Sequence, residues 1–248
     1  MIETVAPRWQ VNSRVHGFTT LRSGGVSTGP YAALNLGLHV GDNEAAVREN
    51  RLRVSKYCHL PPEVHWLQQV HGTDVVHVSQ APQLVPEADA SYTRTPQQVL
   101  AIMTADCLPL FIADHAGTEI ALLHCGWRSV AGGIIERTLA SFQTPTGGLH
   151  AWLGPAIGPL AFEVGDDVVQ AMVQMQPNHL SHFKASGNRW LLDLPALVTA
   201  ELSRHGVYHV SSSGQCTYSE SERFFSYRRD GQTGRMASFL WLAAPPAE

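Results

Sequence analysis

The sequence has few cysteines, and none of them is spaced for a disulfide framework. Its 248 residues include four cysteines and no Cys-x-x-Cys pair: Cys58, Cys107, Cys125 and Cys216. Secreted domains held by disulfides carry a denser set, whereas thiols in a reducing compartment are usually buried, catalytic or metal-bound. We interpret Cys58 and Cys216 as buried apolar side chains, which leaves Cys107 and Cys125 for closer inspection.

Charge and long apolar runs are scarce too. The chain has 17 Lys and Arg against 21 Asp and Glu, a net charge of -4, and neither sign forms a long run. A nucleic-acid surface or a lipid anchor normally requires a basic patch. No stretch approaches the roughly 20 apolar residues that span a bilayer, and residues 1–7 lack the basic and apolar regions of a signal peptide. These absences predict a cytoplasmic protein that binds neither nucleic acid nor membrane, and they leave its oligomeric state open.

Histidine is abundant, but its spacing excludes one class of metalloprotein. There are 13 histidines, and no two are separated by a single residue. A multicopper oxidase needs many imidazoles, including repeated His-x-His pairs, so we exclude that class. The pairs His179/His182 and His205/His209 have helix-face spacing without a third ligand nearby, and we interpret them as surface or capping residues. The roles of His16 and His39 stay open.

The remaining composition predicts a globular α+β protein. Hydrophobic residues make up 44% of the chain and charged residues 15%, and no repeat or linker divides residues 1–248, so we expect one domain. Hydrophobic periodicity indicates strands and helices that interleave irregularly. The expected strands are Val15–Thr20, Val64–Val70, Asp74–Val78, Val99–Thr104, Leu108–Ala113, Glu119–Leu123 and Ala237–Leu242. The expected helices are Glu44–Tyr57 with Asn43 as N-cap, about Val130 to Phe142, Asp167–Met175 and Leu194–His205.

One predicted hairpin brings a cysteine to a histidine. If residues 114–117 form a turn centred between His115 and Ala116, Leu108 faces Leu123 and Cys107 faces His124. Opposed residues in an antiparallel pair lie about 4.5–5.5 Å apart, close enough for both side chains to bind one ion. A slip of the turn by one residue would change the pairing, so a chance pairing remains an alternative to a functional one.

Several short segments carry further information. They are residues 22–27 (RSGGVS), 34–37 (LNLG), 41–43 (GDN), 69–72 (QVHG), 104–109 (TADCLP), 124–128 (HCGWR), 152–158 (WLGPAIG), 225–231 (FSYRRDG) and 233–237 (TGRMA). With these segments in this order, nearly the whole chain resembles the YfiH-like family, once called polyphenol oxidase or laccase-domain proteins.

The resemblance implies a fold, a metal and an activity. It implies a four-layer α/β/β/α sandwich with mixed sheets, and one zinc ion per chain bound by His71, Cys107 and His124. It also implies phosphorolysis of purine nucleosides (adenosine, inosine, guanosine and 5'-methylthioadenosine) together with adenosine deamination. The chain departs from the family pattern where Cys125 replaces an alanine and Ser129 replaces a glycine. We expect Cys125 to place a second thiol near the metal.

Three protein ligands are typical of a catalytic zinc, because a fourth position stays open, whereas structural zinc normally has four. Phosphorolysis also needs a phosphate site, and arginine suits phosphate well. Arg22, Arg128 and Arg228 are the candidates for substrate binding, since each lies in one of the shared segments. The glycines of the first segment could offer backbone N–H groups to an anion, a weak signal.

Asp106 and Trp127 are further candidates next to these residues. Asp106 lies beside Cys107 and is a candidate proton shuttle, although a carboxylate bonded to local backbone is as good an interpretation. Trp127 lies beside His124 in sequence and is a candidate wall of a base-binding pocket.

A second hypothesis needs no metal. Cys107 would be the nucleophile of a cysteine hydrolase or amidase, with cell-wall precursors as a candidate substrate, and His124 would be its base.

Overall fold

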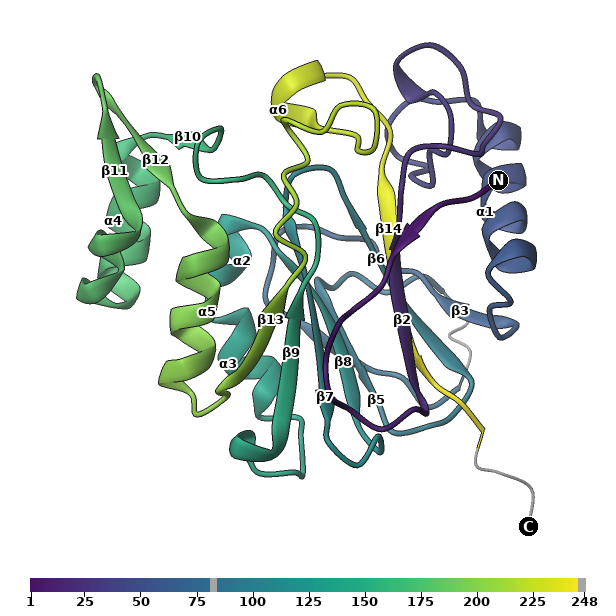
Figure 1. The fold of residues 1–248 in the computed structure, drawn as a ribbon, viewed down its shortest axis with the longest axis horizontal. Helices are drawn as coiled ribbons and strands as arrows, with labels where there is room; N and C mark the ends of the chain where they lie inside the picture. The colour runs from purple at the N-terminus through teal and green to yellow at the C-terminus, as the bar shows by residue number, and fades with distance from the viewer. Residues whose placement is uncertain (81–83, 245–248) are drawn as a thin grey trace.

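Two mixed β-sheets lie face to face, and helices cover the outer face of each sheet (Figure 1). The computed structural model describes residues 1–80 and 84–244. The α/β/β/α sandwich that the resemblance implies is confirmed. None of the helices in these described ranges is long and apolar enough to cross a bilayer.

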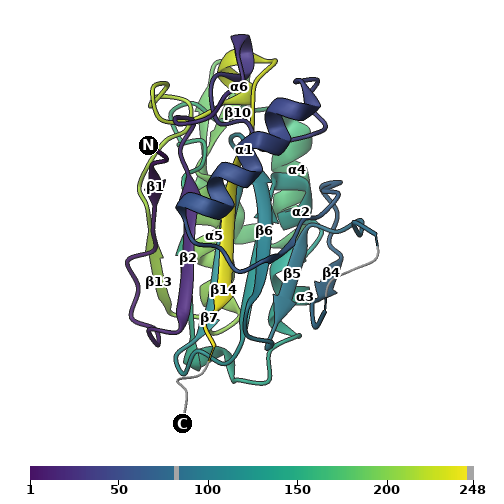
Figure 2. The same cartoon turned by 90° about the vertical axis from the view of Figure 1, so that its right-hand side faces the viewer.

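The first sheet has the strand order β1-β2-β14-β6-β3. Its strands are β1 (Thr4–Val5), β2 (Val15–Thr20), β14 (Met236–Leu242), β6 (Gln98–Thr104) and β3 (Glu63–His65). Helix α1 (Glu44–Tyr57) crosses its outer face diagonally (Figure 2), and Val54 packs there against Phe18 and Phe239. The Asn43 side chain accepts a hydrogen bond from the Ala46 N–H at 3.0 Å and caps this helix. The predicted bounds of β2 and α1 and the cap are confirmed.

The second sheet has the strand order β13-β9-β7-β8-β5-β4. Its strands are β13 (His209–Ser212), β9 (Leu149–Leu153), β7 (Leu108–Asp114), β8 (Ile120–Cys125), β5 (Ala90–Thr93) and β4 (Val75–His77). The helices outside it are α2 (Trp127–Ala131), α3 (Ile134–Leu139), α4 (Asp166–Met175) and α5 (Leu194–Arg204). Shorter helical segments are η1 (Gly29–Tyr31), η2 (Thr146–Gly148), η3 (Pro177–His182) and α6 (Tyr227–Asp230).

The first six residues of strand β7, Leu108 to Ala113, are all apolar because both faces of the strand are buried. Leu108, Leu110 and Ile112 point toward the helices, where they join the largest buried cluster. Phe111 and Ala113 point toward the first sheet and pack in a second cluster. Successive side chains of a strand face opposite sides, so a strand between two apolar layers is hydrophobic throughout.

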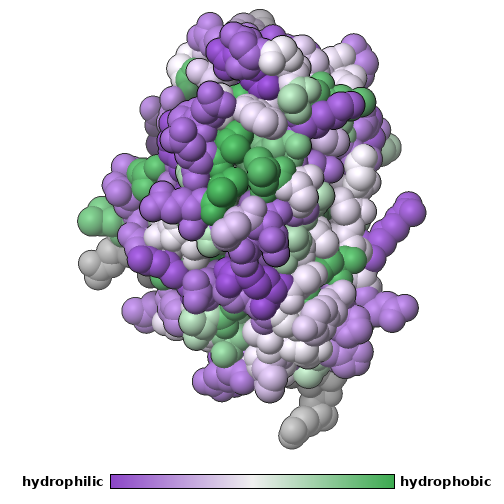
Figure 3. All heavy atoms as spheres, turned by 90° about the vertical axis from the view of Figure 1, so that its left-hand side faces the viewer, coloured by the Kyte–Doolittle hydropathy of each residue, from purple (hydrophilic) through white to green (hydrophobic). Residues whose placement is uncertain are grey.

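A small third sheet stands beside α4 and was not predicted. It has the order β10-β12-β11, formed by Glu163–Val164, Arg189–Leu192 and Phe183–Ser186. Its strands are too short and too exposed to show a clear alternation in the sequence. Figure 3 views the molecule from this side, which is mostly hydrophilic with a patch of hydrophobic residues near the middle.

The predicted register of the β7–β8 hairpin is wrong by two residues. Leu110 faces Leu123, whereas the prediction placed Leu108 there. The turn is centred one residue later, because the Asp114 carboxylate accepts hydrogen bonds from the N–H groups of Thr118 and Glu119. Moving the turn by one residue moves the pairing by two.

Three other predicted elements differ in the structure: two strands are shorter than expected, and one helix is broken. The strands expected at 64–70 and 74–78 are the short β3 and β4, which belong to different sheets. The helix expected over 130–142 is broken between α2 and α3, since Gly133 has a φ of 90°. A side chain at Gly132 would also meet the Thr73 methyl group at 2.7 Å.

Candidate functional site

Three parts of the chain bring His71, Cys107 and His124 together. His71 lies between β3 and β4, Cys107 between β6 and β7, and His124 near the end of β8. The first two segments are the links along which the chain passes from one sheet to the other. One ligand atom from each residue lies within 4.8 Å of the others, and 3.9 Å separates His71 Nε2 from Cys107 Sγ.

Cys107 and His124 meet although their predicted pairing is wrong. In the observed register Pro109 faces His124 and Leu108 faces Cys125, so Cys107 lies diagonally across from His124. Because strand side chains alternate, a shift of two residues keeps both on the same face. Diagonal neighbours are still within reach of a shared ion.

Asp89 organises both histidines, and sequence reasoning missed it. The residue is fully buried at the start of β5. Its carboxylate accepts hydrogen bonds from the backbone N–H groups of Val70, His71 and Gly72 at 3.1, 3.0 and 2.7 Å. It also lies 2.8 Å from His124 Nδ1. A carboxylate that accepts a hydrogen bond from Nδ1–H leaves Nε2 free to bind a metal. Such a carboxylate is a usual hydrogen-bond partner of a metal-bound histidine.

The charges of Cys107 and His124 stabilise each other. Burial alone would raise the pKa of Cys107, but the charge and hydrogen bonds of His124 and His71 lower that pKa to about 6. Burial would lower the pKa of His124, whereas the Cys107 thiolate and Asp89 raise that pKa to about 9. Without metal, the pair is therefore thiolate and imidazolium at neutral pH.

Gly126 leaves room for the two side chains in front of it. A Cβ atom there would lie 2.8 Å from His71 Cδ2 and 3.3 Å from Cys107 Sγ. Carbon atoms do not approach that closely, so a side chain at this position would displace a ligand. The glycine of the HCGWR segment is thus part of the site.

Two cavities meet at the three candidate ligands. A larger one of about 350 Å³ and a smaller one of about 280 Å³ share His71, Ala105, Cys107 and Tyr227 in their walls. The larger cavity adds the polar residues His39, Gln69, Thr104 and Arg235, with Met103. The smaller cavity adds the aromatic and apolar residues Trp127, Ile157, Phe162 and Leu194, with Asp106, Arg128 and Arg228. The site is therefore polar on one side and largely apolar on the other.

The three candidate arginines lie in different surroundings. Arg22 lines neither cavity and donates to the carbonyls of Ala32 and Ser221. Arg128 lies over the Trp127 ring at 4.3 Å in the smaller cavity. Arg228 lines the same cavity and donates to the Glu163 carbonyl. The structure thus brings Arg128 and Arg228 to the site and leaves Arg22 outside it.

Both carboxylate oxygens of Asp106 accept hydrogen bonds from residues far away in the sequence. One carboxylate oxygen accepts from the Thr217 hydroxyl at 2.7 Å, and the other accepts from the Arg228 N–H at 2.7 Å. These bonds fix the segment that carries Tyr227 and Arg228 over the site. They favour the structural interpretation of Asp106 over a proton shuttle.

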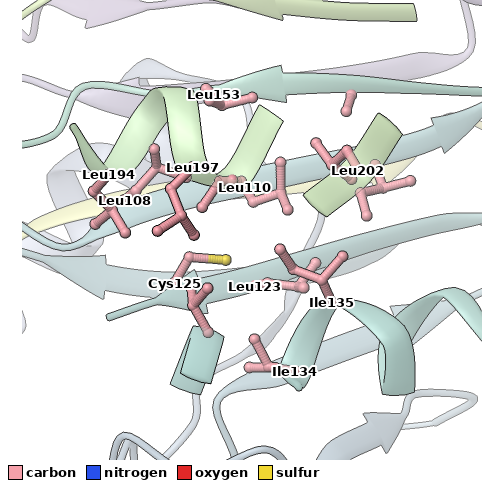
Figure 4. Packing of buried hydrophobic residues seen from close by; sticks show 14 of the residues in the cluster. Leu108, Leu110, Leu123, Cys125, Ile134, Ile135, Leu153, Leu194, Leu197 and Leu202 are labelled. Carbon is pink, nitrogen blue, oxygen red and sulfur yellow. The ribbon is translucent and has the colours of Figure 1, made fainter. Parts of the chain in front are cut away.

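Both departures from the family pattern are buried, and Cys125 faces away from the three candidate ligands. Cys125 follows His124, so it faces the opposite side of β8 and is buried among Leu108, Leu110 and Leu197 (Figure 4). Burial raises the pKa of its thiol, and the charges of Cys107 and Asp89 add to this. The expectation that Cys125 sits beside the metal as a second thiol is not met. The Ser129 hydroxyl is buried without a hydrogen-bond partner in the described chain.

Among the remaining histidines, His179 is not on the surface, but its Nδ1 lies 3.2 Å from the Met172 carbonyl in the last turn of α4, in keeping with the capping alternative. It is 2% exposed, and its Nε2 lies 2.7 Å from the carboxylate of the buried Glu201 on α5. His16 stacks on Trp241 far along the chain, whereas His39 lines the larger cavity.

Together the layered α/β/β/α fold and the His-Cys-His group define a protein with a candidate mononuclear metal centre. Residues 15–243 match the model of the family described as multi-copper polyphenol oxidoreductase laccase. The chain belongs to this laccase-like family. Over residues 1–80 and 84–244, His71, Cys107 and His124 are the one group of three or more side chains whose ligand atoms lie close enough together to hold a metal ion.

Curated relatives carry a different activity in their names. The chain is 45% identical to purine nucleoside phosphorylase YfiH of Escherichia coli, over 98% of this chain and 100% of that protein. It is 42% identical to the purine nucleoside phosphorylase of Haemophilus influenzae, over 97% of this chain and 100% of that protein.

Solved structures share the fold. A protein of Neisseria meningitidis superposes with a TM-score of 0.93 at 45% identity, covering 97% of this chain and 99% of that one. YlmD from Geobacillus stearothermophilus superposes with a TM-score of 0.87 at 33% identity, covering 94% and 93%.

Proposed function

We propose that this protein is a zinc-dependent purine nucleoside phosphorylase, acting on adenosine, inosine, guanosine and 5'-methylthioadenosine and also deaminating adenosine. One observation carries the proposal: three metal-ligating side chains converge where a polar cavity and an aromatic cavity meet. The names of the curated relatives support the reaction. We further propose that residues 1–248 work as one catalytic unit in the cytoplasm.

The three side chains suit a tetrahedral metal. Bonds of about 2.0–2.3 Å in tetrahedral geometry place nitrogen and sulfur ligands about 3.6 Å apart, near the 3.9 Å between His71 Nε2 and Cys107 Sγ. Zinc, when bound, would supply a Lewis acid at the junction of the cavities. The same two-histidine, one-cysteine set also occurs in copper sites, so metal analysis belongs in the test.

The chain's own residues bind and orient the nucleoside in this proposal. Trp127 and Phe162 offer flat apolar surfaces for a purine ring in the smaller cavity. Arg128 and Arg228, in the same cavity, contact the polar edges of the substrate. Phosphorolysis forms a bond from a phosphate oxygen to the ribose C1' while the bond from C1' to the base nitrogen breaks, and the base leaves with a proton.

Metal analysis and a nucleoside panel test the proposal together. We expect one zinc per chain, and release of free base that requires phosphate and stops after chelation. Cys107→Ala and His124→Ala should lose turnover while the circular dichroism spectrum stays that of the wild type. Base release that is independent of phosphate would contradict the phosphorylase assignment, and full activity in either variant would contradict the metal site.

A metal-free cysteine hydrolase or amidase is the second candidate, with an amide such as those in cell-wall precursors as its substrate. The observation in its favour is the Cys107 and His124 pair, whose pKa values of about 6 and about 9 suit a thiolate nucleophile and an imidazolium that holds the thiol proton. It does not need His71 as a metal ligand, although His71 helps to lower the pKa of Cys107. Amide hydrolysis that survives both chelation and His71→Ala would establish it in place of the zinc enzyme.

A further inference from the structure

The larger cavity is lined by a fixed positive charge, the Arg235 guanidinium, which pairs with no carboxylate among the described residues. Arg235 and His39 line it, and Arg51 lies behind them. Neither Arg235 nor Arg51 forms an ion pair within the described chain. The ion pairs of arginine found there all involve other arginines. Uncompensated charge that is partly removed from water is costly, so such groups normally have an anionic partner.

Arg235 is held firmly with part of its guanidinium free. Its backbone N–H donates to Asn35 Oδ1 at 2.9 Å, and its backbone carbonyl accepts from the Leu36 N–H at 3.1 Å. Its Nη1 donates to the carbonyls of Thr233 and Gly234. Nε and Nη2 have no acceptor among the residues that the structure describes. The free edge of the guanidinium is therefore available to a ligand in the cavity.

Arg51 adds a second fixed positive charge. It lies 3.6 Å from the centre of the Trp66 ring and donates to the Leu36 carbonyl at 3.0 and 2.8 Å. Burial, with the charge of Arg48 next, lowers its pKa to about 10, so it stays protonated at neutral pH. The same surroundings lower the pKa of His39, where burial is the main cause, followed by the charges of Arg235 and Arg51.

Thr104 provides an independent observation at the same place. The residue is 2% exposed, lines the larger cavity, and its hydroxyl has no hydrogen-bond partner within the described ranges. It shares a face of β6 with Leu100 and Ile102, which point between the two sheets. Buried hydroxyls nearly always have a partner, so a ligand in the cavity would complete this one.

Two negative groups near Arg235 do not satisfy it. Burial lowers the pKa of Arg235 despite the raising effect of Cys107 and Asp106. Both oxygens of Asp106 already accept hydrogen bonds from Thr217 and Arg228, and the Cys107 thiolate is a candidate metal ligand. The free donors remain directed at whatever fills the cavity.

We propose that the larger cavity is the phosphate site, in which Arg235, His39 and Thr104 bind inorganic phosphate and Arg51 contributes charge from behind. This assignment rests on the proposed function for the role of phosphate as co-substrate. It places phosphate across the metal from the aromatic cavity, so the ribose C1' of a bound nucleoside would lie between them. The sequence-based candidates Arg128 and Arg228 then serve the nucleoside rather than the phosphate.

Isothermal titration of the zinc-loaded protein with inorganic phosphate tests the site directly. Arg235→Gln should weaken phosphate binding by roughly tenfold to a hundredfold, the usual effect of losing a charge-assisted contact, and Thr104→Val should weaken it less. Arg137→Gln removes an exposed arginine that lines neither cavity and should leave binding unchanged. Zinc content and melting temperature are measured for each variant, to separate loss of the site from loss of the fold.

Steady-state kinetics compare the KM for phosphate with the KM for inosine in two variants, one from each cavity. Arg235→Gln should raise the KM for phosphate with little change in the KM for inosine, and Arg128→Gln should do the reverse. A correctly folded, zinc-loaded Arg235→Gln protein with unchanged phosphate affinity overturns the assignment. Phosphate binding that depends on Arg235 in a protein without phosphorolytic activity would uphold the anion site and sink the proposed function instead.

Discussion

Replacing Asp89 with asparagine should weaken metal binding as well as the fold. The substitution preserves size and shape but exchanges one carboxylate oxygen for an NH₂ group. One oxygen accepts from the His71 N–H and His124 Nδ1, and the other accepts from the N–H groups of Val70 and Gly72. Whichever oxygen is replaced, two accepted hydrogen bonds are lost and donors face donors.

The magnitude follows from these contacts. A buried donor left without its acceptor costs about 1–3 kcal/mol, so two of them lower the free energy of unfolding by roughly 2–6 kcal/mol. Outer partners of metal-bound histidines contribute about tenfold to a hundredfold in metal affinity. Asp89 contacts the backbone of one ligand and the ring of the other, so we expect a loss in that range.

Zinc competition with a chromophoric chelator measures the affinity, and urea unfolding with and without zinc measures the stability. Asp114→Asn is the matched control, because Asp114 is equally buried and accepts bonds from Thr118 and Glu119 at the far end of the same sheet. It should lower stability and leave zinc affinity unchanged. If Asp89→Asn binds zinc as tightly as the wild type, the role of Asp89 in orienting the ligands is refuted.

Three further predictions concern steric, chemical and electrostatic features. Gly126→Ala should reduce zinc affinity, because its Cβ would lie 2.8 Å from His71 Cδ2, whereas Gly147→Ala meets nothing within 4 Å and should bind normally in the same titration. In metal-free protein, iodoacetamide should modify Cys107 at a rate that falls as the pH drops below about 6 and leave the buried Cys125 unmodified; mass spectrometry that finds Cys125 labelled first contradicts this. Glu201→Gln should lower the free energy of unfolding by roughly 2–4 kcal/mol, because it breaks the buried pair with His179 and the partly exposed pair with Arg204. Burial raises the pKa of Glu201, but Arg204 and His179 outweigh it and hold that pKa below its usual value, so the stabilisation is present above pH ~4.3 and is lost in more acidic solution. Urea curves of the two proteins that stay equally far apart at pH 3 would disprove that linkage.

Local patterns predicted the elements well where one face or both faces of a segment are buried. The bounds of β2 and α1 and the Asn43 cap follow from periodicity and capping chemistry within a few residues. The apolar run from Leu108 to Ala113 in β7 follows from burial on both sides of the strand. The small sheet around β12 was missed, because partly exposed strands show weak alternation. The break in the helix over 130–142 was also missed, because the need for glycine at position 132 comes from packing against Thr73.

The candidate site divides in the same way. His71, Cys107 and His124 were predicted from residue type and family resemblance, and the hairpin argument for two of them survived a wrong register, because strand side chains repeat every two residues. Asp89, His39, Thr104 and Arg235 were not selected, although two of them lie in the shared segments. An aspartate before a short strand such as β5 has no feature of its own that distinguishes a metal-site partner from a surface carboxylate.

The sequence by itself determined which side chains alternate, which helices are capped and which residue types could hold a metal, since these depend on neighbours within a few positions. Only the tertiary structure decided the hairpin register, the bond from Asp89 to a histidine 35 residues away, and the meeting of a cationic and an aromatic cavity at Cys107. Those contacts arise from the way two sheets pack and the links between them close, and no local pattern along the chain encodes that geometry.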